Sequence, residues 1–178
     1  GRARGGVEGR ARQRFSALTV ADGRLFTQFG KGKDEFAIAF DAATGKELWR
    51  VRTDAERKDQ FGDGPRSTPT VDGERVFVVS ALGKLHALKT TSGETLWSVD
   101  LVKEYGAKVP QWGVSASPLI DGERLIFNTG GRDGYAVVAL DKSNGKLLWH
   151  TFTDIPGYSA RSSSRSVVCA RRSSFPVP

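Results

Sequence analysis

The sequence predicts an all-β protein made of a repeated unit of about fifty residues, and three observations support this. Segments 16–49, 67–97 and 115–149 align with one another. The dipeptide Asp-Gly recurs in them at intervals of 50 and 49 residues, and a tryptophan recurs at intervals of 48 and 52 residues. No window of useful length shows the 3.6-residue periodicity of a helix. Turn signals at a fixed interval are typical of a repeat fold.

The Asp-Gly dipeptide predicts the first turn of each unit. In the second unit an apolar pair precedes Asp72-Gly73, and the apolar run 76–79 follows it. We expect a type I′ hairpin turn, because both of its central residues need positive φ. Asp22 and Asp121 hold the same place in the other units. We interpret these aspartates as turn formers rather than calcium ligands.

Two further turns divide the rest of each unit into three strands. The second turn is expected at Leu82-Gly83 in the second unit and over the longer segments 30–34 and 130–134 in the others. The third strand is expected over 36–40, 85–88 and 135–140. A type I turn closed by a left-handed glycine then leads into a fourth strand that carries the tryptophan. Those glycines are Gly45, Gly93 and Gly145.

Four strands per unit, repeated at this interval, favour the blades of a β-propeller over a sandwich or a barrel. A sandwich does not require the same turn chemistry at a fixed spacing. Only three complete units are present, so we expect part of a propeller of seven or eight blades. The predicted organisation is a basic end (1–14), the blade region (15–158) and a Ser/Arg-rich tail (159–178). We expect the tail to be out-of-frame sequence or a disordered basic segment.

One eleven-residue stretch is shared by the three units: AFDAATGKELW (39–49), ALKTTSGETLW (87–97) and ALDKSNGKLLW (139–149). It resembles the tryptophan-docking motif of the quinoprotein-type, or PQQ-like, β-propeller repeat family. The resemblance implies that each tryptophan packs over the equivalent glycine of a neighbouring blade, where a side chain would block the approach. The residues concerned are Trp49, Trp97 and Trp149, with Gly45, Gly93 and Gly145. We therefore assign them a structural role rather than ligand stacking.

The second copy of this motif departs from the other two at one position. Lys89 stands where the others have Asp41 and Asp141. We expect this unit to lose a turn-stabilising carboxylate and to keep the docking contact.

The connectors 62–76 and 106–125 resemble those of bacterial outer-membrane-assembly-like propellers. This resemblance implies a non-catalytic cell-envelope scaffold that binds other proteins through its loops, in the periplasm or another extracytoplasmic compartment. It leaves open a membrane attachment through a segment ahead of Gly1.

The resemblance also allows a second function, a fragment of a PQQ-dependent alcohol or sugar dehydrogenase. Such enzymes, as a family, hold PQQ with a disulfide between adjacent cysteines and a calcium site, and use a catalytic aspartate. This chain has one cysteine, Cys169, and no Glu-Asn-Asp set that its motifs assign to those roles. We therefore predict no catalytic residue and no metal ligand, and expect PQQ with calcium only under this alternative.

Four residues of the connectors are candidates for binding a ligand. Arg66, Gln111, Trp112 and Ser115 do not repeat, and they precede the innermost strand of a blade, where loops approach the central channel. Trp112 either stacks on a planar ligand or fills the loop between blades. His86 falls within a strand, and we interpret it as a packed or edge residue rather than a base.

The distribution of charge argues against a nucleic-acid-binding face. The net charge is +7, of which residues 1–14 carry +4 and residues 159–178 another +4, leaving −1 for 15–158. The basic charge therefore belongs to the ends and not to the repeats. No run of eighteen apolar residues predicts a membrane span, and with two histidines a zinc site is not expected.

Overall fold

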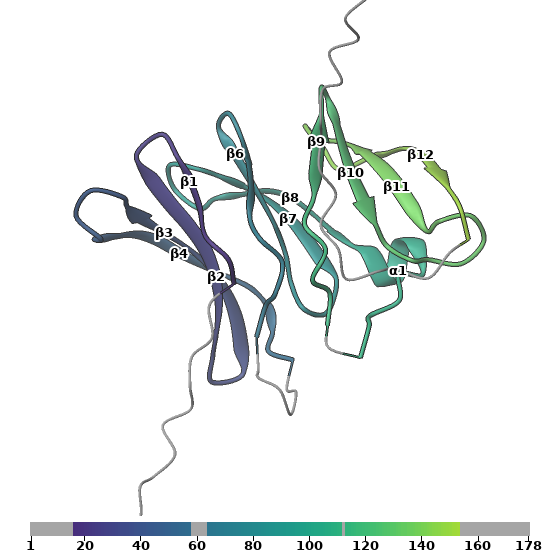
Figure 1. Ribbon diagram of the computed structural model, residues 1–178, viewed down its shortest axis with the longest axis horizontal. Coiled ribbons are helices and arrows are strands. Elements are labelled where there is room, and N and C mark those ends of the chain that lie inside the picture. The colour runs from purple at the N-terminus through teal and green to yellow at the C-terminus, as the bar shows by residue number, and fades with distance from the viewer. Residues whose placement is uncertain (1–15, 58–63, 112, 154–178) are drawn as a thin grey trace, which may run out of the picture.

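A computed structural model describes residues 16–57, 64–111 and 113–153. In it, three four-stranded antiparallel sheets stand side by side (Figure 1). The prediction of an all-β fold built from propeller blades is confirmed. The predicted end segments 1–14 and 159–178 lie outside the described residues.

In each sheet the strands follow one another in chain order as a simple meander. Blade 1 consists of β1 (Thr19–Ala21), β2 (Arg24–Lys31), β3 (Asp34–Asp41) and β4 (Glu47–Ala55). Blade 2 consists of β5 (Thr70–Asp72), β6 (Arg75–Val79), β7 (Lys84–Lys89) and β8 (Thr95–Asp100). Blade 3 consists of β9 (Leu119–Asp121), β10 (Arg124–Asn128), β11 (Val137–Asp141) and β12 (Leu147–Thr151).

The prediction of a type I′ turn at Asp-Gly holds in blade 1 and is wrong in the other two. Asp22 and Gly23 form the two-residue turn of blade 1, with φ of 47° and 69°. In blades 2 and 3 the Asp-Gly dipeptide stands one residue earlier in a hairpin of the same length, and a glutamate follows the glycine within the turn. There the aspartate ends the strand, and Gly73 (φ 55°) or Gly122 (φ 59°) takes the first central position. Glycine at that position is the arrangement of type II′ turns.

The second turn also differs from the expected segments. In blade 1, β2 and β3 stay paired to Lys31 and Asp34, so the turn is only Gly32-Lys33 instead of 30–34. In blade 3 the connection is longer than 130–134, and β11 begins at Val137. The strand starts late because the loop has its own hydrogen bonds: the amides of Thr129 and Gly130 both donate to the carbonyl of Ala136.

The turn before each tryptophan has the expected form. Gly45, Gly93 and Gly145 have φ of 69°, 74° and 75°, in the left-handed region. Each glycine amide donates to the carbonyl four residues earlier, at 2.8, 2.9 and 2.8 Å. A register shift in each blade then places the tryptophan opposite an alanine of the third strand. The three copies are therefore alike in backbone as well as in sequence.

Within the residues that the structure describes, one short helix, α1 (Leu101–Tyr105), interrupts the β structure. Asp100 caps its first turn by accepting a hydrogen bond from the Lys103 amide, and Gly106 ends it in the left-handed conformation. Sequence periodicity missed this helix because five residues are too few to show a period. Among the described residues, no helix is long and apolar enough to cross a membrane.

The hydrophobic core lies between the blades rather than within them. Phe26 and Trp49 of blade 1 pack with Val76, Val78 and Leu88 of blade 2. A second cluster joins blades 2 and 3, with Phe77, Leu85, Phe127 and Leu140 among its buried members. Each sheet is thus held by its neighbours, which explains why the sequence repeats its apolar positions blade by blade.

Candidate functional site

The loops divide into two groups on opposite sides of the blades (Figure 1). The Asp-Gly turns lie on the upper side of the view, while the segments that join one blade to the next, with α1, lie on the lower side. We call the lower side the connector face, and it includes residues 56–57, 64–69 and 101–111 and the turns 32–33 and 80–83. It carries Arg66 and Gln111 of the predicted ligand-binding residues, so it is the candidate site.

The blades that support this face dock through tryptophans. The Trp49 ring lies on Gly93, and Trp97 lies on Gly145. The indole Nε1 of Trp49 donates to the Thr90 carbonyl at 2.9 Å, and that of Trp97 to the Lys142 carbonyl at 3.1 Å. Among the described residues, Gly45 has no such neighbour and Trp149 is 39% exposed. The docking role assigned from the resemblance requires these contacts, and two of the three tryptophans make them.

A second set of contacts, missed by the sequence analysis, links the innermost strands. The Thr19 hydroxyl donates to the Pro69 carbonyl at 2.6 Å, and the Thr70 hydroxyl to the Pro118 carbonyl at 2.7 Å. The signal was present, because Thr19 and Thr70 hold equivalent places in their units. Leu119 takes this place in blade 3, so the series ends there.

On the connector face, Glu35 joins blade 1 to blade 2. It is fully buried at the start of β3, and its Oε2 accepts a hydrogen bond from the Ala81 amide at 2.9 Å. Its Oε1 is buried as well. Burial raises the pKa of Glu35 to about 7, although the Ala81 hydrogen bond opposes the rise. This carboxyl therefore takes up a proton near neutral pH.

Other polar groups of blade 1 hold the same turn of blade 2. Asp54 Oδ2 accepts from the Ser80 hydroxyl at 2.7 Å, and Asp54 Oδ1 lies 3.4 Å from Lys84 Nζ. His86 lies 2.9 Å from the Thr53 carbonyl through Nε2 and is 8% exposed. Burial lowers its pKa, so it stays neutral. This packed position agrees with the sequence interpretation of His86.

The structure describes three of the four predicted ligand-binding residues. Arg66 is half-buried, and Gln111 is exposed with its carbonyl accepting from Arg57 Nη2 at 2.8 Å. Ser115 is half-buried and lines a cleft. Trp112 lies outside the described residues. Arg66 and Gln111 are not among the residues that line this cleft.

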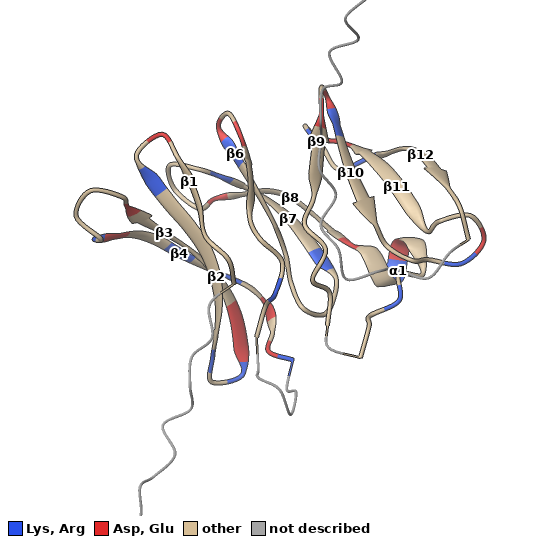
Figure 2. Ribbon diagram, viewed as in Figure 1, with Lys and Arg blue, Asp and Glu red and all other residues tan. Residues whose placement is uncertain are grey.

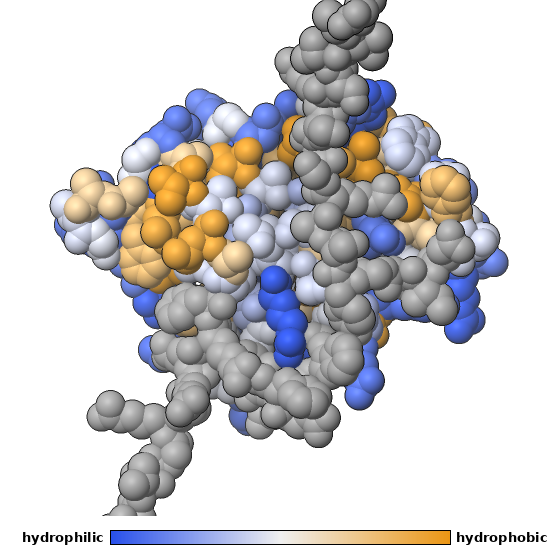
Figure 3. Space-filling model, viewed as in Figure 1, coloured by the Kyte–Doolittle hydropathy of each residue, from blue (hydrophilic) through white to orange (hydrophobic). Residues whose placement is uncertain are grey.

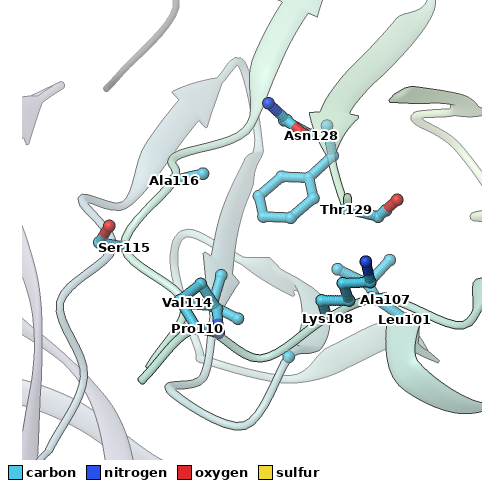
Figure 4. Close-up of a pocket in the computed structure, with 11 residues that line it drawn as sticks. Leu101, Ala107, Lys108, Pro110, Val114, Ser115, Ala116, Asn128 and Thr129 are labelled. Carbon is cyan, nitrogen blue, oxygen red and sulfur yellow. The ribbon is translucent and has the colours of Figure 1, made fainter. Parts of the chain in front are cut away.

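The cleft at Ser115 lies between blades 2 and 3 (Figure 4). Leu101, Val114 and Phe127 form its apolar wall, and Lys108 and Asn128 contribute polar groups. Its cavity volume is about 10 Å³, about the space of one water molecule. Pockets for cofactor-sized ligands have volumes of roughly 300–1,000 Å³, so this cleft does not fit PQQ.

Charged groups on these blades are mixed in sign. Lysines, arginines and acidic residues are interspersed over the three sheets (Figure 2). Lys142 joins blade 3 to blade 2 by pairing with Asp72 at 2.8 Å and also pairs with Glu123 at 3.2 Å. No group of three His, Cys, Asp or Glu side chains that could hold a metal ion occurs within residues 16–57, 64–111 and 113–153.

Comparison with known proteins agrees with this architecture. A family model described as outer membrane protein assembly factor BamB matches residues 33–175. The chain belongs to this family. BamB of Yersinia pestis is 29% identical over 145 residues, which are 79% of this chain and 33% of that protein. The crystal structure of BamB from Moraxella catarrhalis has a TM-score of 0.56 at 24% identity, covering 76% of this chain and 37% of the other.

The same comparison finds dehydrogenases of similar architecture. Quinohemoprotein alcohol dehydrogenase ADH IIB of Pseudomonas putida is 31% identical over 144 residues, 76% of this chain and 19% of that enzyme. The quinohemoprotein alcohol dehydrogenase of Comamonas testosteroni has a TM-score of 0.54 at 19% identity, covering 75% of this chain and 20% of that one. The chain thus spans between a fifth and a third of the curated relatives named here.

Proposed function

We propose that this chain is part of a non-catalytic cell-envelope scaffold that binds other proteins through its connector face. The observation that carries the proposal is how the polar groups of this face are used. Glu35 accepts from a backbone amide, Asp54 from a serine hydroxyl, and Arg57 donates to a backbone carbonyl. These bonds fix loops to one another, which favours a preformed surface over a cavity that opens for a small molecule.

The comparisons support the same proposal. The matching family is described as an outer membrane protein assembly factor, and we infer a related role in assembly for this chain. An extracytoplasmic location follows from that role.

A cross-linking experiment in the full-length protein tests the proposal. A photoreactive amino acid is placed at Gln111, which is exposed on the connector face, and at Glu123 on the opposite side as the matched control. We expect cross-links to proteins of the outer-membrane assembly machinery from position 111 and at least fivefold fewer from position 123. Equal yields, or none from either position, would contradict the proposal.

The alternative is a fragment of a PQQ-dependent alcohol or sugar dehydrogenase, and the 31% identity to ADH IIB favours it. If it holds, the rest of the protein supplies the cofactor site. Adding PQQ and calcium to the full-length protein and assaying dye reduction with alcohols and sugars separates the two functions. The scaffold proposal predicts no turnover above that of PQQ alone.

A further inference from the structure

The tryptophan turn of blade 3 differs from the other two in the residue that precedes its glycine. This residue is Thr44 in blade 1, Ser92 in blade 2 and Asn144 in blade 3. The chain has one other asparagine, Asn128, and a threonine follows it. In an Asn-Gly pair the glycine nitrogen attacks the asparagine side-chain amide more readily than in other pairs, because glycine has no side chain to hinder the approach. The turn of blade 3 therefore contains a reactive group that the other two lack.

The hydrogen bonds of Asn144 prepare its side-chain carbonyl for this attack. Asn144 Oδ1 accepts from the Lys146 amide at 2.9 Å, and Asn144 Nδ2 donates to Asp141 Oδ2 at 3.0 Å. Attack by the nitrogen of Gly145, which lies between Asn144 and Lys146 in the chain, places negative charge on Oδ1. A backbone amide that already donates to this oxygen stabilises that charge, as in an oxyanion hole. The side chain is thus held against the segment that contains its attacking nitrogen.

Asn144 is accessible to water. Its turn lies beside the Asp-Gly turn of the same blade, where the Lys142 amide donates to the Glu123 carbonyl at 3.0 Å. Figure 3 shows hydrophilic residues along this upper edge of the molecule. Asn144 is exposed, and so is its equivalent Ser92, although blade 3 follows blade 2. The exposure of Asn144 is therefore a property of the turn and does not depend on a free face of blade 3.

One hydrogen bond holds the reaction back. The Gly145 amide donates to the Asp141 carbonyl at 2.8 Å, and the glycine is buried beneath the Trp97 ring. The nitrogen attacks only after it has left this bond, so the turn must open first. Opening also disturbs the bond from Trp97 Nε1 to the Lys142 carbonyl, which belongs to the same turn. The reaction is therefore coupled to the undocking of blade 2 from blade 3.

We propose that Asn144 is a site of spontaneous deamidation and that its modification loosens the junction between blades 2 and 3. The Gly145 nitrogen forms a bond to Asn144 Cγ, the Cγ–Nδ2 bond breaks, and the proton of the glycine amide passes to Nδ2, which leaves as ammonia. The product is a five-membered succinimide ring. Water then opens one of the two bonds between the ring nitrogen and a carbonyl carbon, which gives aspartate or isoaspartate. No oxidant or reductant takes part.

The isoaspartate product does not fit the docking contact. Its main chain runs through the former side chain of residue 144 and is longer by one methylene group. An added Cβ at Gly145 would already come within 2.7 Å of Trp97 Cε3, so the glycine has no room to shift toward the ring. Either product also replaces the amide that bonded to Asp141 with a carboxylate, and two adjacent carboxylates repel each other. Both changes weaken the hold of the turn on Trp97.

Mass spectrometry of the full-length protein after incubation at pH 8 tests the proposal. We expect deamidation of Asn144 to be at least about tenfold faster than that of Asn128, with isoaspartate among the products. N144S is the matched control, since it introduces the residue of blade 2, and it should stay unmodified at this position. The proposal is overturned if Asn144 of the protein stays intact over the time in which the isolated peptide 141–149 is fully converted.

Two tryptophan variants test the coupling to docking. W97F removes the N–H that bonds to Lys142 and should speed the deamidation of Asn144 several-fold. W49F makes the same change between blades 1 and 2 and should leave that rate unchanged, so equal rates in the two variants would overturn the coupling.

The stability of the modified protein tests the consequence. The isoaspartate form, separated by ion exchange, should unfold at a lower urea concentration than N144D, which has the new carboxylate on a main chain of normal length. Identical urea midpoints for the isoaspartate form and the parent would overturn the loosening of the junction.

Discussion

The indole of Trp49 lies so close to Gly93 that an added Cβ would come within 2.7 Å of ring atom Cε3. Trp97 has the same relation to Gly145, also at 2.7 Å. In both cases the indole N–H bonds to the carbonyl three residues before the glycine. One turn therefore supplies the surface and the acceptor, which explains why glycine and tryptophan repeat at a fixed spacing.

Gly93 and Gly45 offer a matched pair for measuring this contact. Both have positive φ, so alanine at either position strains the backbone by about 1 kcal/mol. G93A also forces a methyl group into the Trp49 ring, which we expect to remove roughly 1–3 kcal/mol more from the free energy of unfolding. Urea titrations of G93A and G45A at low protein concentration measure the difference. Equal losses of unfolding free energy in the two variants would show that the Trp49 ring moves aside at no cost in stability.

The tryptophans themselves should differ in the same way. W49A removes a buried ring and leaves a cavity between blades 1 and 2, so we expect a loss of about 3–5 kcal/mol. W149A removes a ring that is 39% exposed, and we expect a loss of about 1 kcal/mol in the single chain. Thermal and urea unfolding followed by circular dichroism compare them. A loss for W149A as large as that for W49A would mean that the exposed fraction of a tryptophan side chain does not determine its contribution to the free energy of unfolding.

Glu35 makes stability depend on pH. Its pKa is about 7 in the folded chain against 4.5 in the unfolded chain, so between these values the folded state holds a proton that the unfolded state has released. The protonated Glu35 carboxyl contributes its full amount to the free energy of unfolding below pH 4.5, and this amount is lost as pH rises through 7. It corresponds to about 3 kcal/mol.

The variant E35Q should remove that dependence and leave the fold in place, because the amide oxygen still accepts from Ala81. Burial lowers the pKa of His86, whose contribution falls as pH drops below its ordinary value of 6.5. The two groups act in opposite directions, so the informative quantity is the difference in unfolding free energy between E35Q and the parent at pH 5 and pH 8. We expect the unfolding free energy of E35Q to increase relative to that of the parent as pH rises. A difference that stays constant would contradict the raised pKa of Glu35.

The sequence predicted the features that repeat and missed those that depend on one place in the chain. Gly45, Gly93 and Gly145 were located correctly, since each is set by local turn chemistry. The Asp-Gly turns of blades 2 and 3 were assigned wrongly, because there the dipeptide stands one residue earlier in a hairpin of the same length, which leaves the aspartate in the strand. The helix α1 was missed because it is a single capped turn.

The sequence predicted that the candidate site lies on the connectors between blades, but it did not identify the buried polar groups there. Arg66, Gln111 and Ser115 do lie on the connectors, but Glu35 and Asp54, which hold blade 1 to blade 2 there, were not singled out. Glu35 has no acidic counterpart in the other units, and an acidic residue within an alternating strand is ordinarily a solvent-exposed one. Its burial follows from the packing of two blades, which a pattern within one unit does not describe.

Lys89 leaves the tryptophan turn of blade 2 without the carboxylate that Asp41 and Asp141 supply in blades 1 and 3, and replacing it tests what that carboxylate contributes. In blade 1 the Asp41 carboxylate accepts hydrogen bonds from the amide and hydroxyl of Thr44, at 2.8 and 2.7 Å, and these bonds lower its pKa. Ser92 is the equivalent of Thr44 in blade 2, but Lys89 offers it no side-chain acceptor. Lys89 also lies opposite Arg75, whereas Asp41 lies opposite Arg24.

K89D should therefore raise the thermal midpoint by supplying the missing acceptor and by replacing two like charges with an opposite pair. K89A is the control, because it removes only the repulsion and should give a smaller rise. A turn carboxylate with a lowered pKa stabilises the fold above its unfolded pKa and is lost as pH falls through the folded value. The advantage of K89D over K89A should thus be present at pH 7 and should shrink as pH falls below the ordinary aspartate pKa of 3.8, and an advantage that does not change in acid would show that the carboxylate is not its source.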